Sequence, residues 1–299
     1  TCMGCRGSLV RVQSPRPLIL YLGEDAMGKL SVLNIGGHPK DAILYAGGTM
    51  ANHIANGDNV CTLTPTHGLS HHETAIANFQ RNKKFDFNSL IEERKSELIA
   101  ASAELGVTDV RFLGHDDTII LPKPEIIQEI TDVILEVKPD IIITHWPNDT
   151  VLAHANATQM TLIAIEAASC VQEDVSKQPH SIKQIFFHVS QGRTNVRENS
   201  RPPNPTTIID ITDVINLKTN AMNKFKSQYY GGSGTLQKKL GEALDGNIHA
   251  IHARVPYAEC FIADQPALYS LLPLSEYELS IKNKTKEENL KHLSQFLIQ

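Results

Sequence analysis

The sequence predicts an α/β protein built on a doubly wound, mostly parallel sheet with helices on both faces. Short apolar runs alternate with longer helical stretches from Leu30 to Ser169, and this β-α-β-α order is typical of such a sheet. The first run, 30–35, is apolar on both faces, as expected of a strand buried between two layers of helices. Polar clusters follow three of these runs, where open parallel sheets form their sites.

The first half of the chain supplies four strand–helix pairs and one polar, histidine-rich loop at 67–74. Asn56-Gly57 predicts the end of the first helix and Gly106 that of the second, since these residues close helices readily. We expect strands at 30–35, 59–66, 110–114 and 140–145, and helices at 41–55, 89–104, 125–137 and 152–169.

The second half predicts fewer regular elements. We expect strands at 184–190 and 206–211, a helix at 213–228 and a long surface loop at 192–205. The pattern indicates a single domain, 27–299, with a C-terminal extension. Residues 1–26 are expected to be a disordered tail or a misassigned start, with translation beginning at Met27.

Composition excludes some classes of protein. A net charge of −5 and a pI near 6.2 give no reason to expect a nucleic-acid partner. No apolar run approaches the roughly 18 residues of a membrane span. The five cysteines are few and scattered, which favours a reducing, cytoplasmic location, and the lone pair Cys2 and Cys5 is a weak zinc signal.

His38 and Asp41 follow the first strand on one tight turn, behind two glycines. A histidine and a carboxylate so close together form half of a metal site, which a second strand end can complete. Two nitrogens and one carboxylate, with a position left for water, are typical of a catalytic zinc site. The sequence therefore indicates Zn²⁺, with Fe²⁺ as the other candidate.

Three segments resemble the PIG-L, or LmbE-like, zinc de-N-acetylases. GGHPKDAILYAGGTM (36–50) resembles the family's AHPDDE…GGT, and the segment 94–118 resembles its R-x-x-E…A…LG…LG-x-x-D. THWPNDTVLAH (144–154) lies where the family has P-x-D-x-H-P-D-H. The resemblance, which weakens after about residue 180, implies a Rossmann-like sheet. It also implies metal-dependent removal of an acetyl group from N-acetylglucosamine or a related N-acyl amino sugar.

The resemblance also implies roles for individual residues. His38 and Asp41 fall on two zinc ligands, and Lys40 falls on the aspartate that serves the family as general base. An ungapped comparison puts His154 on the third zinc ligand and Val151 on the histidine that helps to stabilise the oxyanion. A comparison anchored on the following helix would instead leave Ala157 at the ligand position.

Other residues could take over the proton transfer. Asp149 is the better candidate base by charge, and its alternative role is to cap the following helix. His145, at the strand end, could equally hydrogen-bond to the backbone. His71, His72 and Glu73 could reach the mouth of the site or could simply be solvated.

Arg94 and Asp117 match positions that hold sugar hydroxyls in the family. Arg94 could instead pair with Glu97 one turn along its helix, and Asp117 could cap a turn, with Asp116 as its rival. Further along the chain, a dense polar run could line the pocket, with His252 as a substrate contact, or could be a buried strand with a salt bridge. This run contains His249, His252, Arg254, Tyr257 and Glu259.

The sequence thus predicts a zinc hydrolase that acts on an N-acetylglucosamine-type sugar conjugate. Lys40 and Val151 leave open an inactive relative that binds the sugar without turnover. A nucleotide-dependent enzyme is disfavoured, because no GxGxxG follows the first strand. Gly47-Gly48 lacks the Lys-Ser/Thr pair of a phosphate loop and is better interpreted as close helix packing.

Overall fold

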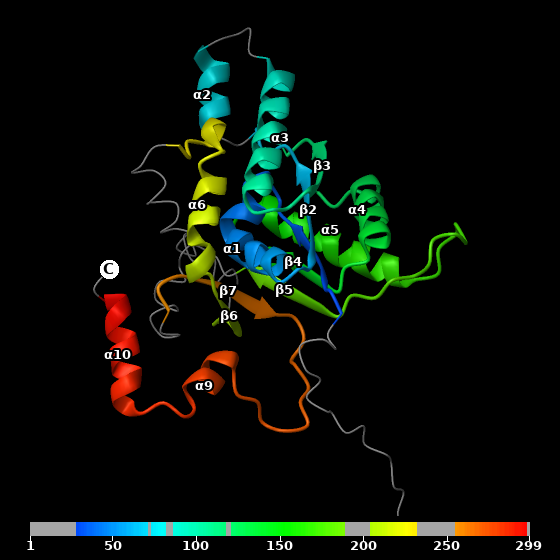
Figure 1. The fold of residues 1–299 in the computed structure, drawn as a ribbon. Helices are drawn as coiled ribbons and strands as arrows, with labels where there is room; N and C mark the ends of the chain where they lie inside the picture. The colour runs from blue at the N-terminus through cyan, green and yellow to red at the C-terminus, as the bar shows by residue number, and fades with distance from the viewer. Residues whose placement is uncertain are drawn as a thin grey trace, which may run out of the picture.

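The computed structural model describes residues 28–70, 73–81, 86–117, 121–188, 204–231 and 255–297. These residues form one seven-stranded sheet with helices packed against it (Figure 1). Its strands are β1 (Ser31–Ile35), β2 (Asn59–Thr66), β3 (Asp109–His115), β4 (Ile141–Thr144), β5 (Gln184–His188), β6 (Thr207–Asp210) and β7 (Ala258–Ala263). The long helices are α1 (Asp41–Ala55), α3 (Phe87–Glu104), α4 (Pro124–Val137) and α5 (Leu152–Ser169). Shorter ones are α2 (Glu73–Arg81), α6 (Ile215–Met222), α9 (Glu276–Ile281) and α10 (Lys286–Leu297), with 3₁₀ turns at Thr212–Val214 and Lys226–Gln228.

The strand order is β3-β2-β1-β4-β5-β7-β6. The strands β1 to β5 pair with one another in parallel, whereas β7 runs antiparallel to both β5 and β6. The prediction of a mostly parallel, doubly wound α/β sheet is confirmed. Because β1 lies between β2 and β4, the loops that follow these three strands meet at one edge of the sheet.

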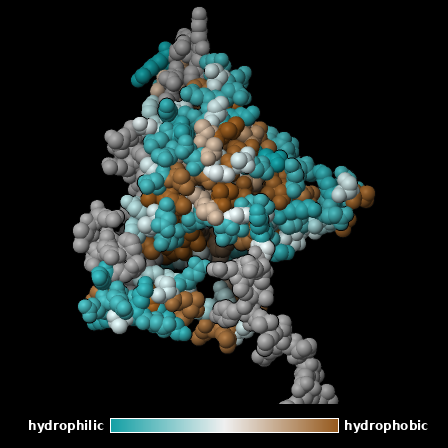
Figure 2. All heavy atoms as spheres, in the orientation of Figure 1, coloured by the Kyte–Doolittle hydropathy of each residue, from teal (hydrophilic) through white to brown (hydrophobic). Residues whose placement is uncertain are grey.

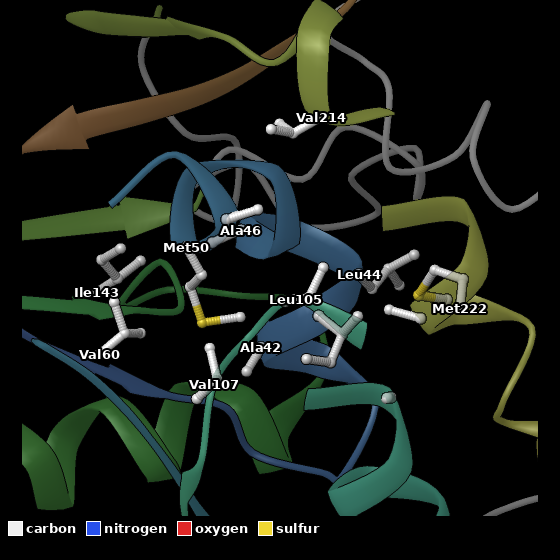
Figure 3. Close-up of a cluster of buried hydrophobic side chains, with 14 of the residues drawn as sticks. Ala42, Leu44, Ala46, Met50, Val60, Leu105, Val107, Ile143, Val214 and Met222 are labelled. Carbon is white, nitrogen blue, oxygen red and sulfur yellow. The ribbon is translucent and has the colours of Figure 1, made fainter. Parts of the chain in front are cut away.

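Helices cover both faces of the sheet. Neighbouring strand residues alternate between the two cores, with Val32 facing α1, α3 and α6 and Leu33 facing α4 and α5. Figure 3 shows the first core, where Met50 of α1 lies beside Val60 and Ile143 of the sheet. Each such side chain contributes about 1.5–3 kcal/mol of hydrophobic stabilisation when it is fully buried.

The helix α1 is kinked at Ala46, whose φ of −140° and ψ of 19° are not helical. Beyond the kink, Gly48 lies so close to Ile211 that an added Cβ would come within 2.5 Å of it. This contact confirms close packing as the reason for Gly48, whereas an added Cβ at Gly47 would meet its nearest atom only at 3.4 Å. The backbone N–H groups of Gly48 and Thr49 donate to the carboxylate of Glu259 on β7, at 2.9 and 2.7 Å.

Glu259 also forms an ion pair with Lys218 of α6 at 2.7 Å, and both side chains are almost fully buried. The alternative interpretation of this region, a buried strand with a salt bridge, therefore describes Glu259 correctly. The pair links α1, α6 and β7, which are far apart in the sequence.

Some expected boundaries differ from the structure. The segment expected as a loop at 67–74 begins α2 at Glu73, and the helix expected at 213–228 ends at Met222. It ends there because the chain turns at 223–224 and then forms a 3₁₀ turn, closed by Tyr229 with a left-handed φ of 63°. Residues 1–26, 189–190 and most of the loop expected at 192–205 lie outside the described residues.

After β7 the chain runs along the lower side of the molecule in Figure 1 to α9 and α10. Figure 2 shows brown, hydrophobic spheres at the bottom of the molecule. The exposed large hydrophobic residues of the segment after β7 are Leu268, Tyr269, Leu271, Leu272 and Leu274.

Candidate metal centre

The candidate metal centre lies at the edge of the sheet where β1 and β4 end side by side. His38 lies in the loop after β1, and Asp41 is the first residue of α1. His154 lies in the first turn of α5, which follows β4. The expected convergence of these three side chains is present, with one possible ligand atom from each within 4.8 Å of the others.

The Asp41 carboxylate is the centre of this group. Its Oδ2 lies 3.0 Å from Nδ1 of His38 and 3.2 Å from Nε2 of His154. Gly37 allows this approach, because an added Cβ there would come within 3.2 Å of the His154 ring. Oδ1 of Asp41 is buried and accepts no hydrogen bond from the described residues.

The electrostatic environment suits a cation. Burial opposes ionisation of Asp41, but His154, Lys40 and His38 hold its pKa well below its usual range. Burial also opposes the charge on His154, yet the carboxylates of Asp41 and Asp149 raise its pKa to about 9. Burial lowers the pKa of His38. The donor set of two imidazoles and one ionised carboxylate fits zinc or iron(II).

Asp149 supports His154 from the side opposite Asp41. Its Oδ2 lies 3.1 Å from Nδ1 of His154, and its Oδ1 accepts the backbone N–H of Val151 at 2.8 Å. Val151 is the residue that precedes the first turn of α5. This N–H belongs to the residue before the helix, and no side chain caps the first turn of α5, so the expected capping role is not found. The Asp149 carboxylate instead fixes the start of the helix and orients His154.

His145 and Lys40 flank the group. Nε2 of His145 accepts the backbone N–H of Gly37 at 2.8 Å, and its ring stacks on that of His154 with centroids 3.9 Å apart. Burial, followed by the positive charge of His154, lowers the pKa of His145 well below its usual range. Nζ of Lys40 lies 3.6 Å from Oδ1 of Asp41, and its side chain is 20% exposed.

Arg94 and Asp117 form a second wall near the ends of β2 and β3. Nη1 of Arg94 donates to the backbone carbonyls of His67 and Gly68, so it supports the loop after β2. Burial lowers the pKa of Arg94 to about 10. The alternative pairing of Arg94 with Glu97 is wrong, because that carboxylate instead accepts hydrogen bonds from Ser227.

Asp117 faces the metal-ligand candidates. Its Oδ2 lies 4.0 Å from Nε2 of His38, and its Oδ1 lies 3.0 Å from Nδ1 of His67 and accepts the N–H of Ser70. Burial opposes its ionisation, but these hydrogen bonds hold its pKa below the usual range. Asp116 is exposed and accepts the Ser70 hydroxyl at 2.9 Å.

For several sequence candidates the structure gives no position. His252, His71 and His72 lie outside the described residues, as do His249 and Arg254. Two histidines near the site were not expected there. His67 follows β2 directly, and His188 ends β5. The available signal was their position, since each is a histidine at the carboxyl end of a buried parallel strand.

Three groups of described residues have metal-ligand spacing. The second consists of His145, Asp149 and His154, and so shares a residue with the first. The third consists of His67, Asp116 and Asp117, which already bind one another and Ser70. The group of His38, Asp41 and His154 is distinguished by its buried, unsatisfied carboxylate oxygen.

Within the described residues, no helix has the length and apolar character needed to cross a membrane.

Comparisons with known proteins place this site in context. Residues 33–168, which contain His38, Asp41 and His154, match the PIG-L family, described as GlcNAc-PI de-N-acetylase. A 1D-myo-inositol 2-acetamido-2-deoxy-alpha-D-glucopyranoside deacetylase of Rhodococcus erythropolis is 27% identical over 241 residues. The alignment covers 66% of this chain and 80% of that relative.

Two solved structures share the fold. N,N'-diacetylchitobiose deacetylase of Pyrococcus horikoshii has a TM-score of 0.61 at 22% identity, covering 78% of this chain and 82% of its own. GalB, the 4-carboxy-2-hydroxymuconate hydratase of Pseudomonas putida, has a TM-score of 0.69 at 20% identity. That alignment covers 82% of this chain and 100% of GalB. The fold therefore occurs in proteins described as a deacetylase and as a hydratase.

Proposed function

Residues 33–168 belong to the PIG-L family of de-N-acetylases, and from this premise we propose that the protein is a metal-dependent hydrolase. It removes the N-acetyl group from an N-acetylglucosamine-type sugar conjugate. The observation that carries the proposal is the convergence of His38, Asp41 and His154, whose possible ligand atoms lie within 4.8 Å of one another.

His38, Asp41 and His154 would hold the metal, which we propose to be Zn²⁺, with Fe²⁺ as the alternative. Such a metal polarises an amide carbonyl and lowers the pKa of a bound water to about 7. Asp149 would hold His154 in the tautomer that turns Nε2 toward Asp41, since its carboxylate accepts from Nδ1.

Three residues are candidates for proton transfer, and they differ in whether their polar atoms already have partners and in how exposed their side chains are. Both oxygens of Asp149 have partners, and Nε2 of His145 accepts from Gly37. Lys40 has the most exposed side chain of the three. As an ammonium, it would donate a proton to the leaving amine rather than take one from water, so we assign it the role of acid.

Arg94 and Asp117 would bind the sugar from the opposite wall. Arg94 would act mainly by positioning the loop that carries His67 and Gly68, because its Nη1 donates to the backbone carbonyls of both residues. Asp117 would accept a sugar hydroxyl close to His38. We also propose a cytoplasmic location, since the five cysteines are few and scattered along the sequence.

A second candidate function is sugar binding without turnover. It is favoured by Lys40, which places an ammonium 3.6 Å from Asp41 where a carboxylate base would serve a hydrolase. Val151 favours it too, because its side chain cannot form hydrogen bonds at the start of α5.

The test combines metal analysis with release of acetate from N-acetylglucosamine conjugates. We expect one bound metal and measurable acetate release, both abolished by His154→Ala. The matched control is His180→Ala, which removes a histidine whose Nε2 donates to Pro139 far from the centre. Metal without acetate release, followed by activity in Lys40→Asp, would establish the binding function instead.

A further inference from the structure

His188 ends β5 beside the candidate metal centre. The register pairs Thr144 of β4 with Phe187 of β5, so His188 stands level with His145. The ring centroids of these two histidines are 5.2 Å apart, and that of Tyr45 is 5.3 Å from His188. The side chain of His188 belongs to the group of rings that surrounds the centre.

The ring nitrogens of His188 are unusual within this group. The residue is 2% exposed, and neither Nδ1 nor Nε2 has a hydrogen-bond partner among the described residues. In contrast, His38, His145 and His154 each have a polar partner, at 3.0, 2.8 and 3.1 Å. A buried polar group without a partner lowers the stability of the folded state.

Packing alone does not require a histidine at this position. Its neighbours Tyr45 and Phe261 are aromatic, with centroids 5.3 and 6.2 Å away, and a phenylalanine would meet them equally well. The imidazole is also uncharged at ordinary pH, because burial lowers the pKa of His188 to about 3. It therefore presents one N–H donor and one acceptor nitrogen without a net charge.

We propose that His188 is a further substrate-binding residue of this site, whose imidazole hydrogen-bonds to an oxygen of the bound N-acyl amino sugar. This inference rests on the function proposed above. Two rings lie between His188 and the metal-ligand candidate His154: His145, which stacks on His154 at 3.9 Å, and Tyr45, whose centroid is 6.4 Å from that of His154. A sugar held at the metal by its amide can span that separation.

Two variants of His188 test the proposal. His188→Phe keeps an aromatic ring and removes both nitrogens, and His188→Gln keeps a donor and an acceptor. We expect His188→Phe to unfold at the same or a higher temperature and to lower kcat/KM for an N-acetylglucosamine conjugate roughly 10-fold. His188→Gln should recover part of that loss. The control His180→Phe removes a histidine outside the site and should leave kcat/KM unchanged.

Unchanged kcat/KM in His188→Phe, or equal losses in the Phe and Gln variants, would overturn the role of His188 while leaving the hydrolase proposal intact. Should the wild-type protein bind N-acetylglucosamine without hydrolysing it, the hydrolase proposal fails. In that case calorimetry would give the Kd for N-acetylglucosamine of the wild type, His188→Phe and His188→Gln, and comparing these values would test the role of His188. Absence of both binding and hydrolysis in the wild type overturns both proposals.

Discussion

The side chains of Asp149 and His154 are hydrogen-bonded, with Oδ2 of the carboxylate 3.1 Å from Nδ1 of the imidazole. The other ring nitrogen, Nε2, thereby faces Asp41 at 3.2 Å. A carboxylate behind a metal-binding histidine fixes the tautomer and strengthens the ligand.

The first prediction concerns this support. Asp149→Asn should weaken metal binding by about 10- to 100-fold, because the amide no longer supplies a negative charge behind His154. Competition with a chelator of known affinity measures the change. Asp116→Asn, an exposed aspartate of the neighbouring wall, serves as control and should bind the metal as the wild type does. Wild-type affinity in Asp149→Asn would show that its carboxylate only binds the backbone of Val151 before α5.

The second prediction concerns the buried ion pair of Lys218 and Glu259. Lys218→Met leaves the carboxylate buried without its counter-charge, so it should lower the free energy of unfolding by about 3–5 kcal/mol. Urea titration measures the loss. The double variant Lys218→Met/Glu259→Gln should recover part of it. If the double variant is the less stable of the two, the carboxylate is stabilised mainly by Gly48 and Thr49.

The third prediction compares two adjacent glycines in α1. Gly48→Ala should cost about 1–3 kcal/mol, because its Cβ would lie 2.5 Å from Ile211. Gly47→Ala meets its nearest atom, on Lys218, only at 3.4 Å. It should be neutral or up to about 1 kcal/mol stabilising, since alanine favours the helix. Equal effects at the two positions would contradict the close contact with Ile211.

The fourth prediction concerns pH. Asp58 accepts hydrogen bonds from Leu30 and Asn56 and lies 2.7 Å from Nδ1 of His53. Burial opposes its ionisation, but these contacts hold its pKa below the usual range. A depressed pKa stabilises the folded state above the unfolded pKa of about 3.9, and this stabilisation is lost as the pH falls toward the folded value.

Asp58→Asn should therefore be less stable than the wild type at pH 7, by about 1–2 kcal/mol. The difference should shrink as the pH falls below about 3.9, because the carboxyl of Asp58 then becomes protonated in the unfolded state. Urea unfolding of the two proteins at pH 7, 5 and 3 measures it. A difference that is constant across this range would mean that the charge of Asp58 plays no part.

The order of strands and helices was predictable because each depends on local pattern. Apolar runs and glycine stops located the strands and the first helices, since these signals lie within a few residues of one another. The kink at Ala46 was not predictable. It depends on Glu259, which lies about 210 residues further along the chain and caps the second part of α1.

In the candidate site, too, the residues with a local sequence signal were predictable, and those placed by distant parts of the chain were not. His38 and Asp41 share a turn, so their spacing alone indicated a half-site, and the family resemblance supplied His154. His188 carried no motif, and its role becomes visible only when β5 is placed beside β4. The alternative pairing of Arg94 with Glu97 was wrong, because Nη1 of Arg94 donates instead to the backbone carbonyls of His67 and Gly68.

The antiparallel strand β7 has a consequence for the order of synthesis. It is made after the other six strands of the sheet, yet it inserts between β5 and β6 and delivers Glu259 to the interior of α1. A nascent chain that has not yet emerged past Ala263 can assemble β1 to β5 but lacks the carboxylate that binds Gly48 and Thr49. The contacts of α1 are therefore complete only after β7 has been synthesised.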